Sequence, residues 1–434
     1  MDENKKQTGY PSIDKPWLKY YSRASNMTEL PSPDCSMDAF LYQCNRNRLD
    51  NVALNYFGAK ISFQSLFEQI DRTAAALQAI GVKEGNIVSL CGLNTPEFIY
   101  LLYAVNKIGA VCNWLGLTSP VSDLRTQFSS AGSKLVFVID VAYEQIKEAV
   151  QDTEVNKIIA VPLSASMPKL MGMLYGLKSR MPKANVMTWK NFLHLSEDVV
   201  LTPVEIAGDK LAMIEYTGGS TGVPKGVMLS NKNLNSYYIN FHKTNINGLS
   251  NYNNRDTCLA CVPLFLAFGV SGACHGPLCH GMELILAPDP SPETLGELIL
   301  RSQPNHIIAG RVQIEGFIHA ATGKTKNVSF VHSIMYGGEA ANRTWEQNTR
   351  KALEKNSLSA PILNGYGMTE SSACILIALK EINDGLIPLG NVSIRITDPD
   401  DPHTELGYGT EGELCLSSDT VMIGYYKNAA ETEK

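Results

Sequence analysis

Segments with helical spacing alternate with short apolar runs between residues 62 and 139, and this alternation constrains the fold more than any other feature. Apolar residues recur from Phe63 to Leu77 at the spacing of an amphipathic helix, which Gly81 ends. A second helical segment covers 97–107, and apolar runs such as 135–139 have the length of buried strands. Because such alternation produces βαβ units with right-handed crossovers, it predicts a layered α/β fold with a mostly parallel sheet.

The length of the chain predicts several subdomains. Its 434 residues exceed the ~100 to 200 residues usual for one domain. A polar, proline-containing arm is predicted at 1–36, and two α/β subdomains at 37–200 and 201–373. From residue 374 to 434 the pattern changes to short β-rich pieces separated by Gly, Pro and Asp, which predicts a β-rich subdomain.

Composition excludes some partners. The net charge of -6 and the lack of a basic block interleaved with aromatics argue against nucleic acid. No run approaches the ~18 apolar residues needed to cross a bilayer, so no stable membrane insertion is expected. The amino terminus has no leader pattern and the ten cysteines are scattered, which predicts a cytoplasmic protein. A small anion can still bind to a local cluster of N–H groups and cations.

Two segments admit more than one interpretation. The basic stretch 164–187, with Leu170 and Met173 beside lysines and arginines, could contact a membrane or an acidic partner; an amphipathic surface helix is favoured because the run is short. Cys258 and Cys261 form a C-x-x-C, followed closely by Cys274, His275, Cys279 and His280. The strand predicted at 257–262 would point the first two thiols to opposite faces, so core packing is favoured over zinc.

A glycine- and hydroxyl-rich loop gives the sharpest functional signal. It reads Tyr216-Thr217-Gly218-Gly219-Ser220-Thr221-Gly222-Val223-Pro224-Lys225-Gly226. We expect it to connect a strand at 211–215 to a helix that Ser230 caps. Its glycines let the backbone approach a phosphate, its hydroxyls donate hydrogen bonds, and Lys225 adds a cation. Because Pro224 precedes the lysine and no Gly-Lys-Ser or Gly-Lys-Thr follows, it is not a Walker loop.

This loop resembles the phosphate loop of the adenylate-forming superfamily, except that Gly218 stands where the family usually has serine. A second segment, Asn364-Gly365-Tyr366-Gly367-Met368-Thr369-Glu370, is similar to another signature of the family, in the form found in acyl-CoA ligases. The resemblance implies that Tyr366 stacks on adenine near Asn364, that Thr369 contacts the α-phosphate and that Glu370 holds Mg²⁺. An aromatic face, a hydroxyl and a hard oxygen ligand suit these tasks.

Further matches extend the resemblance over nearly the whole chain. Gly337-Gly338-Glu339-Ala340 resembles the strip that lines the other side of adenine and the floor of the acyl pocket, and the segments 61–63, 94–98 and 421–426 resemble other landmarks. The implied fold is the layered αβαβα large domain, with two sheet-and-helix subdomains and a small β-barrel-like subdomain. The implied nucleotide-binding residues are Thr217, Gly218, Gly219, Ser220, Thr221, Gly222, Lys225, Gly338, Glu339, Ala340, Asn364, Gly365, Tyr366, Gly367 and Thr369.

The implied activity is that of an AMP-forming acid-thiol ligase. Such an enzyme uses ATP and Mg²⁺ to convert a carboxylic acid to acyl-AMP, and then transfers the acyl group to coenzyme A. The implied catalytic residues are Thr217, Lys225, Thr369 and Glu370. Two alternatives stay open: an adenylation domain that loads a carrier-protein thiol, and a non-catalytic module that binds a nucleotide or an acyl group.

The resemblance also bears on the substrate and on the extent of the machinery. Phe268 stands where amino-acid-activating domains carry an aspartate, and it cannot balance a buried ammonium, so an aryl or alkyl acid is favoured. The implied pocket contains Phe241, Phe268, Gly269, Gly337 and Gly338, while Leu266 replaces the histidine common in acyl-CoA ligases. The family's ribose-binding aspartate, hinge and carboxy-terminal lid domain, which carries a catalytic lysine, would follow Tyr426. They are absent from these residues, so little ligase activity is expected from them alone.

Overall fold

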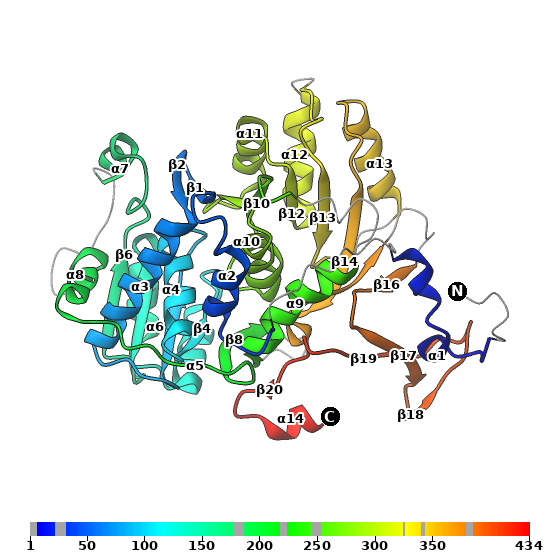
Figure 1. Ribbon diagram of the computed structural model, residues 1–434, viewed down its shortest axis with the longest axis horizontal. Helices are drawn as coiled ribbons and strands as arrows, with labels where there is room; N and C mark the ends of the chain where they lie inside the picture. Colours follow the sequence, from blue (N-terminus) through cyan, green and yellow to red (C-terminus); the bar gives the residue numbers. More distant parts are fainter. Residues whose placement is uncertain are drawn as a thin grey trace.

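Two large β-sheets flanked by helices form the body of the computed structural model, and a small third sheet lies beside the amino-terminal segment (Figure 1). The structure describes residues 7–21, 32–176, 186–217, 224–244, 253–323, 326–339, 343–378 and 385–434. The predicted layered α/β fold is confirmed.

The first large sheet has eight strands in the order β20-β9-β8-β4-β3-β5-β6-β7. Strands β3 to β8 pair in parallel, whereas β9 and β20 run antiparallel to their neighbours at one edge. The strands are β3 Ile87–Cys91, β4 Val111–Trp114, β5 Leu135–Ile139, β6 Lys157–Val161, β7 Met187–Thr188, β8 Leu211–Thr217, β9 Lys225–Ser230 and β20 Gly424–Tyr425.

The second large sheet has nine strands in the order β16-β15-β14-β13-β12-β10-β11-β1-β2. Strands β10 to β14 pair in parallel, so their carboxyl ends meet at one edge. The strands are β1 Val52–Tyr56, β2 Ala59–Ser62, β10 Thr257–Ala260, β11 Glu283–Leu286, β12 His306–Ala309, β13 Ser333–Gly337, β14 Ile362–Met368, β15 Ala373–Ala378 and β16 Leu386–Pro388. Each large sheet therefore takes strands from both sides of residue 200.

The small sheet has the order β18-β17-β19, with β17 Ser393–Asp398, β18 Asp401–Glu405 and β19 Glu413–Ser417. The amino-terminal segment lies against it: α1, Pro11–Asp14, contacts β17, and Ser12 donates a hydrogen bond to Glu405. The next turn, η1 Pro16–Tyr20, buries Trp17 in a cluster with Leu363 and Ile377 of the nine-stranded sheet. The arm thereby joins the small sheet to a large one.

Most of the remaining helices pack on the large sheets. The remaining helices are α2 Met37–Asn45, α3 Phe63–Ala79, α4 Pro96–Lys107, α5 Val121–Ala131, η2 Asp140–Ala142, α6 Tyr143–Ala149, α7 Lys169–Gly176, α8 Trp189–His194, η3 Leu195–Asp198, α9 Asn231–Thr244, the π-helix η4 Phe268–His275, α10 Gly276–Cys279, α11 Pro292–Ser302, α12 Arg311–Gly323, α13 Arg343–Glu354, η5 Thr369–Ser371 and α14 Ala429–Glu433. Of these, α7 and α14 bury no residue. Within the described ranges, no helix is long and apolar enough to cross a membrane.

The helices predicted from periodicity follow the expected burial. In α3, the Ser62 hydroxyl accepts a hydrogen bond from the Ser65 N–H, and the apolar residues at helical spacing from Phe63 to Leu77 are buried except Phe67, which is half-buried. Helix α4 is buried from Pro96 through Asn106, as expected of a helix packed between layers. The periodicity therefore identified both a surface helix and a central one.

The glycine-rich loop has a different setting from the one predicted. We expected it to lead into a helix, but β9 follows it and pairs antiparallel with β8, so the loop closes a hairpin. The reason is the alternating burial of Val227 and Leu229, which gives this segment the period of a strand. Ser230 does cap α9, because its hydroxyl accepts a hydrogen bond of 3.1 Å from the Asn233 N–H. The helix amino terminus therefore lies a strand away from the loop.

The structure describes both cysteines of the C-x-x-C and part of the basic stretch 164–187. Cys258 and Cys261 lie in separate buried clusters, as expected if their side chains point to opposite faces of the sheet. The described part of the basic stretch forms α7, on which Leu170, Met173 and Leu174 are exposed. Lys178, Arg180 and Lys183 lie outside the described residues.

Asn94 fixes the segment that leads into η4. Its side-chain amide donates hydrogen bonds of 2.9 Å to the carbonyls of Ala260 and Val262, and its oxygen accepts one of 3.2 Å from the Leu264 N–H. Because these groups are buried, Asn94→Ala is expected to lower the free energy of unfolding by about 3 kcal/mol. Urea denaturation of this variant, with the exposed Gln151→Ala as control, measures the effect. A loss equal to that of the control would contradict the assignment.

Candidate active site

The glycine-rich hairpin places Thr217 and Lys225 side by side. Thr217 ends β8, Lys225 begins β9, and the two are register partners in the antiparallel pair. Both residues are half-buried. The tip residues Gly218, Gly219, Ser220, Thr221 and Gly222 lie outside the described residues.

The second motif lies at the carboxyl end of β14. Gly365 pairs with Gly337 at the end of β13 and Asn364 pairs with Tyr336, so the strip that starts at Gly337 leaves β13 beside the motif. Along β14 burial gives way to exposure, and the Tyr366 side chain is 43% exposed. Gly338 and Glu339 are also exposed, whereas Ala340 lies outside the described residues. The exposed Tyr366 ring is therefore accessible for stacking on a flat ligand.

Close packing explains glycine at two of these positions. A Cβ atom at Gly337 would lie 2.7 Å from the Gly365 carbonyl oxygen, and one at Gly367 would lie 1.8 Å from the Ala373 carbonyl oxygen. Both approaches are shorter than real Cβ contacts allow. The glycines therefore let β14 and its neighbours approach closely at the edge where the motif lies.

The turn η5 brings the end of the second motif to the hairpin. It packs against β8 and β9, and the Glu370 carbonyl accepts a hydrogen bond of 2.8 Å from the Met422 N–H. The Glu370 carboxylate accepts another, of 2.9 Å, from the Tyr425 hydroxyl. Burial is the largest cause that raises the pKa of Tyr425 to about 12, and the hydrogen bond to Glu370 adds to it. The phenol therefore remains protonated at neutral pH.

Lys225 contacts the same tyrosine. Its ammonium lies 5.0 Å from the centroid of the Tyr425 ring and 2.6 Å from Oε1 of Glu431 on α14. The hydrogen bond from Lys225 lowers the pKa of Glu431. Tyr425 is held in place because β20 pairs with β9. The segment 425–431 therefore contacts both Lys225 of the first motif and Glu370 of the second.

These two contacts were missed by sequence reasoning. The segment 421–426 was noted as a landmark, but no spacing signal links Tyr425 to Glu370 or Glu431 to Lys225. Both contacts arise from pairing of strands about two hundred residues apart in the chain. Among the predicted site residues, the structure brings Thr217, Lys225, Thr369 and Glu370 to one region around the hairpin and η5.

A small apolar cavity of about 20 Å³, room for about one water molecule, lies between α9, η4 and the nine-stranded sheet. It is lined by Tyr237, Tyr238, Phe241, Cys258, Gly272, Gly276, Pro277, His280, Met282, His306, Ile308 and Met335. Of the predicted pocket residues, Phe241 lines it directly. The Phe268 ring lies close to Gly337 and to the lining residue Gly272, but Phe268, Gly269, Gly337 and Gly338 are not among the residues that line the cavity.

A buried acid lies under the hairpin. Glu215 of β8 is fully buried two residues before Thr217, and neither carboxylate oxygen has a hydrogen-bond partner within the described residues. Burial raises the pKa of Glu215 to about 8, so the side chain is mostly neutral at pH 7. Because burial disfavours the charged form, ionisation of Glu215 lowers the stability of the folded chain.

The fold is shared with known adenylate-forming enzymes. A solved long-chain-fatty-acid-CoA ligase from Archaeoglobus fulgidus superposes with a TM-score of 0.79 at 18% identity, covering 93% of this chain and 79% of that one. A solved anthranilate CoA ligase in complex with anthranoyl-AMP superposes with a TM-score of 0.77 at 17% identity, covering 93% and 73%. The architecture is therefore that of an adenylate-forming enzyme.

The sequence matches agree with the fold. The family described as AMP-binding enzyme matches residues 40–426, and the chain belongs to this family. The long-chain-fatty-acid–CoA ligase of Bacillus subtilis (strain 168) is 22% identical over 96% of this chain and 75% of that protein. The 4-coumarate–CoA ligase CCL1 of Humulus lupulus is 24% identical over 83% of this chain and 63% of that protein. The resemblance noted from the two motifs is thereby confirmed.

Proposed function

We propose that this protein uses ATP to convert an apolar carboxylic acid to its acyl-adenylate, from which the acyl group passes to coenzyme A. The observation that carries the proposal is the meeting of Lys225 and Glu370, from two separate motifs, around Tyr425. A cation for phosphate and an acid for a metal ion are thereby placed in one site. The matched ligases act on carboxylic acids with coenzyme A, as their names state, which supports this choice.

The residues fit a magnesium-bound nucleotide. The exposed Tyr366 ring suits stacking on the flat face of adenine, and Asn364 lies two residues before it on β14. Thr369 would contact the α-phosphate, and Thr217 and Lys225 the β- and γ-phosphates. Glu370 supplies the hard oxygen that Mg²⁺ prefers, and the bound ion would offset negative charge on the phosphates.

The proposed chemistry consists of two nucleophilic displacements, and in each of them one bond forms while another breaks. A carboxylate oxygen of the substrate attacks the α-phosphorus of ATP, and the bond to pyrophosphate breaks, which gives acyl-AMP. The thiol of coenzyme A then attacks the acyl carbon and AMP leaves with that oxygen. Lys225 stabilises the departing pyrophosphate, and Thr369 orients the transferring phosphorus, so catalysis is mainly electrostatic and positional.

The apolar lining of the cavity favours an aryl or alkyl acid as substrate, for which the cavity has to widen. Phe268, close to the lining residue Gly272, offers no charge for an ammonium group. The half-buried His280 and the buried His306 are the main polar features of the cavity. An apolar tail in this cavity would direct its carboxylate toward Gly337 and the nucleotide site.

Exchange of labelled pyrophosphate into ATP tests the proposal. The assay is run on this chain and on a form extended through a carboxy-terminal domain, with a panel of aryl, alkyl and amino acids. We expect exchange with apolar acids and none above background with α-amino acids. If the extended form shows no exchange with any acid, the chain is a binding module and the proposal fails. Product analysis with coenzyme A and with a carrier-protein thiol then identifies the acceptor.

A further inference from the structure

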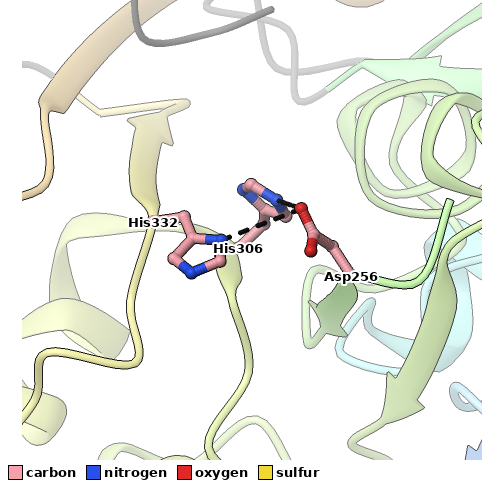
Figure 2. A group of neighbouring side chains, drawn as sticks. All are labelled: Asp256, His306 and His332. Atoms are coloured by element: carbon pink, nitrogen blue, oxygen red, sulfur yellow. Dashed lines mark hydrogen bonds and ion pairs between the residues drawn. The ribbon is translucent and has the colours of Figure 1, made fainter. Parts of the chain in front are cut away.

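Asp256, His306 and His332 meet at the end of the nine-stranded sheet where its parallel strands begin, opposite the end where the second motif follows β14 (Figure 2). Asp256 precedes β10, His306 begins β12 and His332 precedes β13. These three strands are neighbours in the order β13-β12-β10. Residues separated along the chain are thus brought to one point by the strand pairing.

The donor atoms have the separations of a metal site. Oδ2 of Asp256 lies 3.0 Å from Nε2 of His306 and 3.8 Å from Nδ1 of His332, and the three atoms lie within 4.8 Å of one another. With bonds of about 2.0 to 2.1 Å in a tetrahedral zinc site, ligand atoms lie about 3.3 Å apart. The two separations from Asp256 lie within about 0.5 Å of that value.

The surroundings of His306 fit a ligand role. Nδ1 of its ring lies 2.8 Å from the Ser333 hydroxyl, while Nε2 faces Asp256. Metal-bound histidines usually make such a hydrogen bond with the second ring nitrogen, because it fixes the orientation of the ring. Asp256 and His306 are both buried, and Oδ2 of Asp256 also accepts a hydrogen bond from the Asn253 N–H.

The backbone around the three residues is fixed by Asn305. Its carbonyl accepts a hydrogen bond of 2.7 Å from the His332 N–H, and its side-chain oxygen accepts one of 3.0 Å from the Thr257 N–H. Its amide donates to the Phe330 carbonyl. The three side chains are therefore held near one another by contacts that need no ion, which reduces the entropic cost of binding one.

We propose that Asp256, His306 and His332 form a binding site for one divalent transition-metal ion of the zinc type. Two imidazole nitrogens and one carboxylate favour Zn²⁺ or Co²⁺ over Mg²⁺ and Ca²⁺, which prefer oxygen ligands. The fourth position is open to water on the side of His332, whose side chain is 52% exposed. The ion would join the ends of three strands. Since His306 also lines the cavity, it would fix the far end of the acyl site.

The competing interpretation is a hydrogen bond between His306 and Asp256 without an ion, which gives His332 no role. Calorimetric titration of the chelator-treated chain, with any histidine tag removed, distinguishes the two. We expect one Zn²⁺ per chain and a Co²⁺ complex with the visible absorption of a four-coordinate site. His332→Ala is expected to weaken Zn²⁺ binding at least 10-fold. Because the side chain is largely exposed, this variant should fold.

The matched control is His319→Ala, an exposed histidine on α12, which should leave Zn²⁺ binding unchanged. Asp256→Asn keeps the size of the side chain and should lower affinity as His332→Ala does. Zn²⁺ is expected to raise the unfolding temperature of the unaltered chain and not that of His332→Ala. The proposal is overturned if Zn²⁺ does not bind at millimolar concentration, or if all three variants bind it equally. ATP binding is measured in parallel, so failure of this site is distinguishable from failure of the ligase proposal.

Discussion

Replacing Lys225 with alanine is expected to weaken binding of magnesium ATP roughly 100-fold, the loss that follows when a charge-assisted contact to phosphate is removed. The Lys225 ammonium is the cation at the base of the glycine-rich hairpin, and no backbone group can replace its charge. Equilibrium binding to the purified chain measures the effect. Lys232→Ala is the control, because Lys232 lies further along the same segment and pairs with Asp419. Equal affinities in the two variants would exclude Lys225 from the nucleotide site.

A matched variant tests the partner of Lys225. Glu431 lies 2.6 Å from the Lys225 ammonium and competes with phosphate for it. Glu431→Gln is therefore expected to tighten ATP binding several-fold, and more so at low salt, where the ion pair is least screened. Glu433→Gln, on the exposed side of the same short helix, should have no effect. Weaker binding in Glu431→Gln would instead show that Glu431 positions Lys225 for the phosphates.

Glu215→Gln is expected to stabilise the protein strongly above pH 8. The pKa of Glu215 is raised by burial from 4.5 to about 8 in the folded chain. Between these values the unfolded chain holds fewer protons than the folded one, so the Glu215 contribution to stability falls as pH rises from about 4.5 and levels off above 8. The interval between the two pKa values corresponds to about 5 kcal/mol.

Urea denaturation at pH 5, 7 and 9 measures this dependence. Glutamine cannot ionise, so the variant should lose the decline between pH 5 and pH 9, and its advantage should be greatest at pH 9. Glu144→Gln is the control, because the Glu144 side chain is 80% exposed. The same decline in Glu215→Gln and in the unaltered chain would show that Glu215 is not the group responsible.

Much of the fold could be predicted because its signals are local. The burial of α3 and α4 follows from apolar spacing within each segment, and the parallel strands read as short apolar runs. Strand β9 is missed because its last residue, Ser230, also caps α9, so the local signals predict a loop that leads directly to the helix. Pairing of β9 with β8 and β20 depends on distant residues, and no local pattern reports it.

The residues of the site likewise fall into those that a continuous motif identifies and those that only strand pairing brings together. The two motifs identify Lys225 and Glu370 because each is recognisable as a continuous segment. Tyr425 and Glu431 acquire their contacts only when β20 pairs with β9, so their roles could not be predicted from spacing. The group at Asp256, His306 and His332 is likewise invisible in the sequence. Its members are neighbours only because three parallel strands begin side by side.

The most direct test of the central claim follows one oxygen atom. A substrate acid labelled with ¹⁸O in its carboxylate is incubated with magnesium ATP, coenzyme A and the form extended through a carboxy-terminal domain, and the nucleotide products are analysed by mass spectrometry. If the carboxylate attacks the α-phosphorus, one ¹⁸O atom appears in AMP and none in pyrophosphate. Label in inorganic phosphate together with ADP, or AMP without label, would contradict formation of an acyl-adenylate.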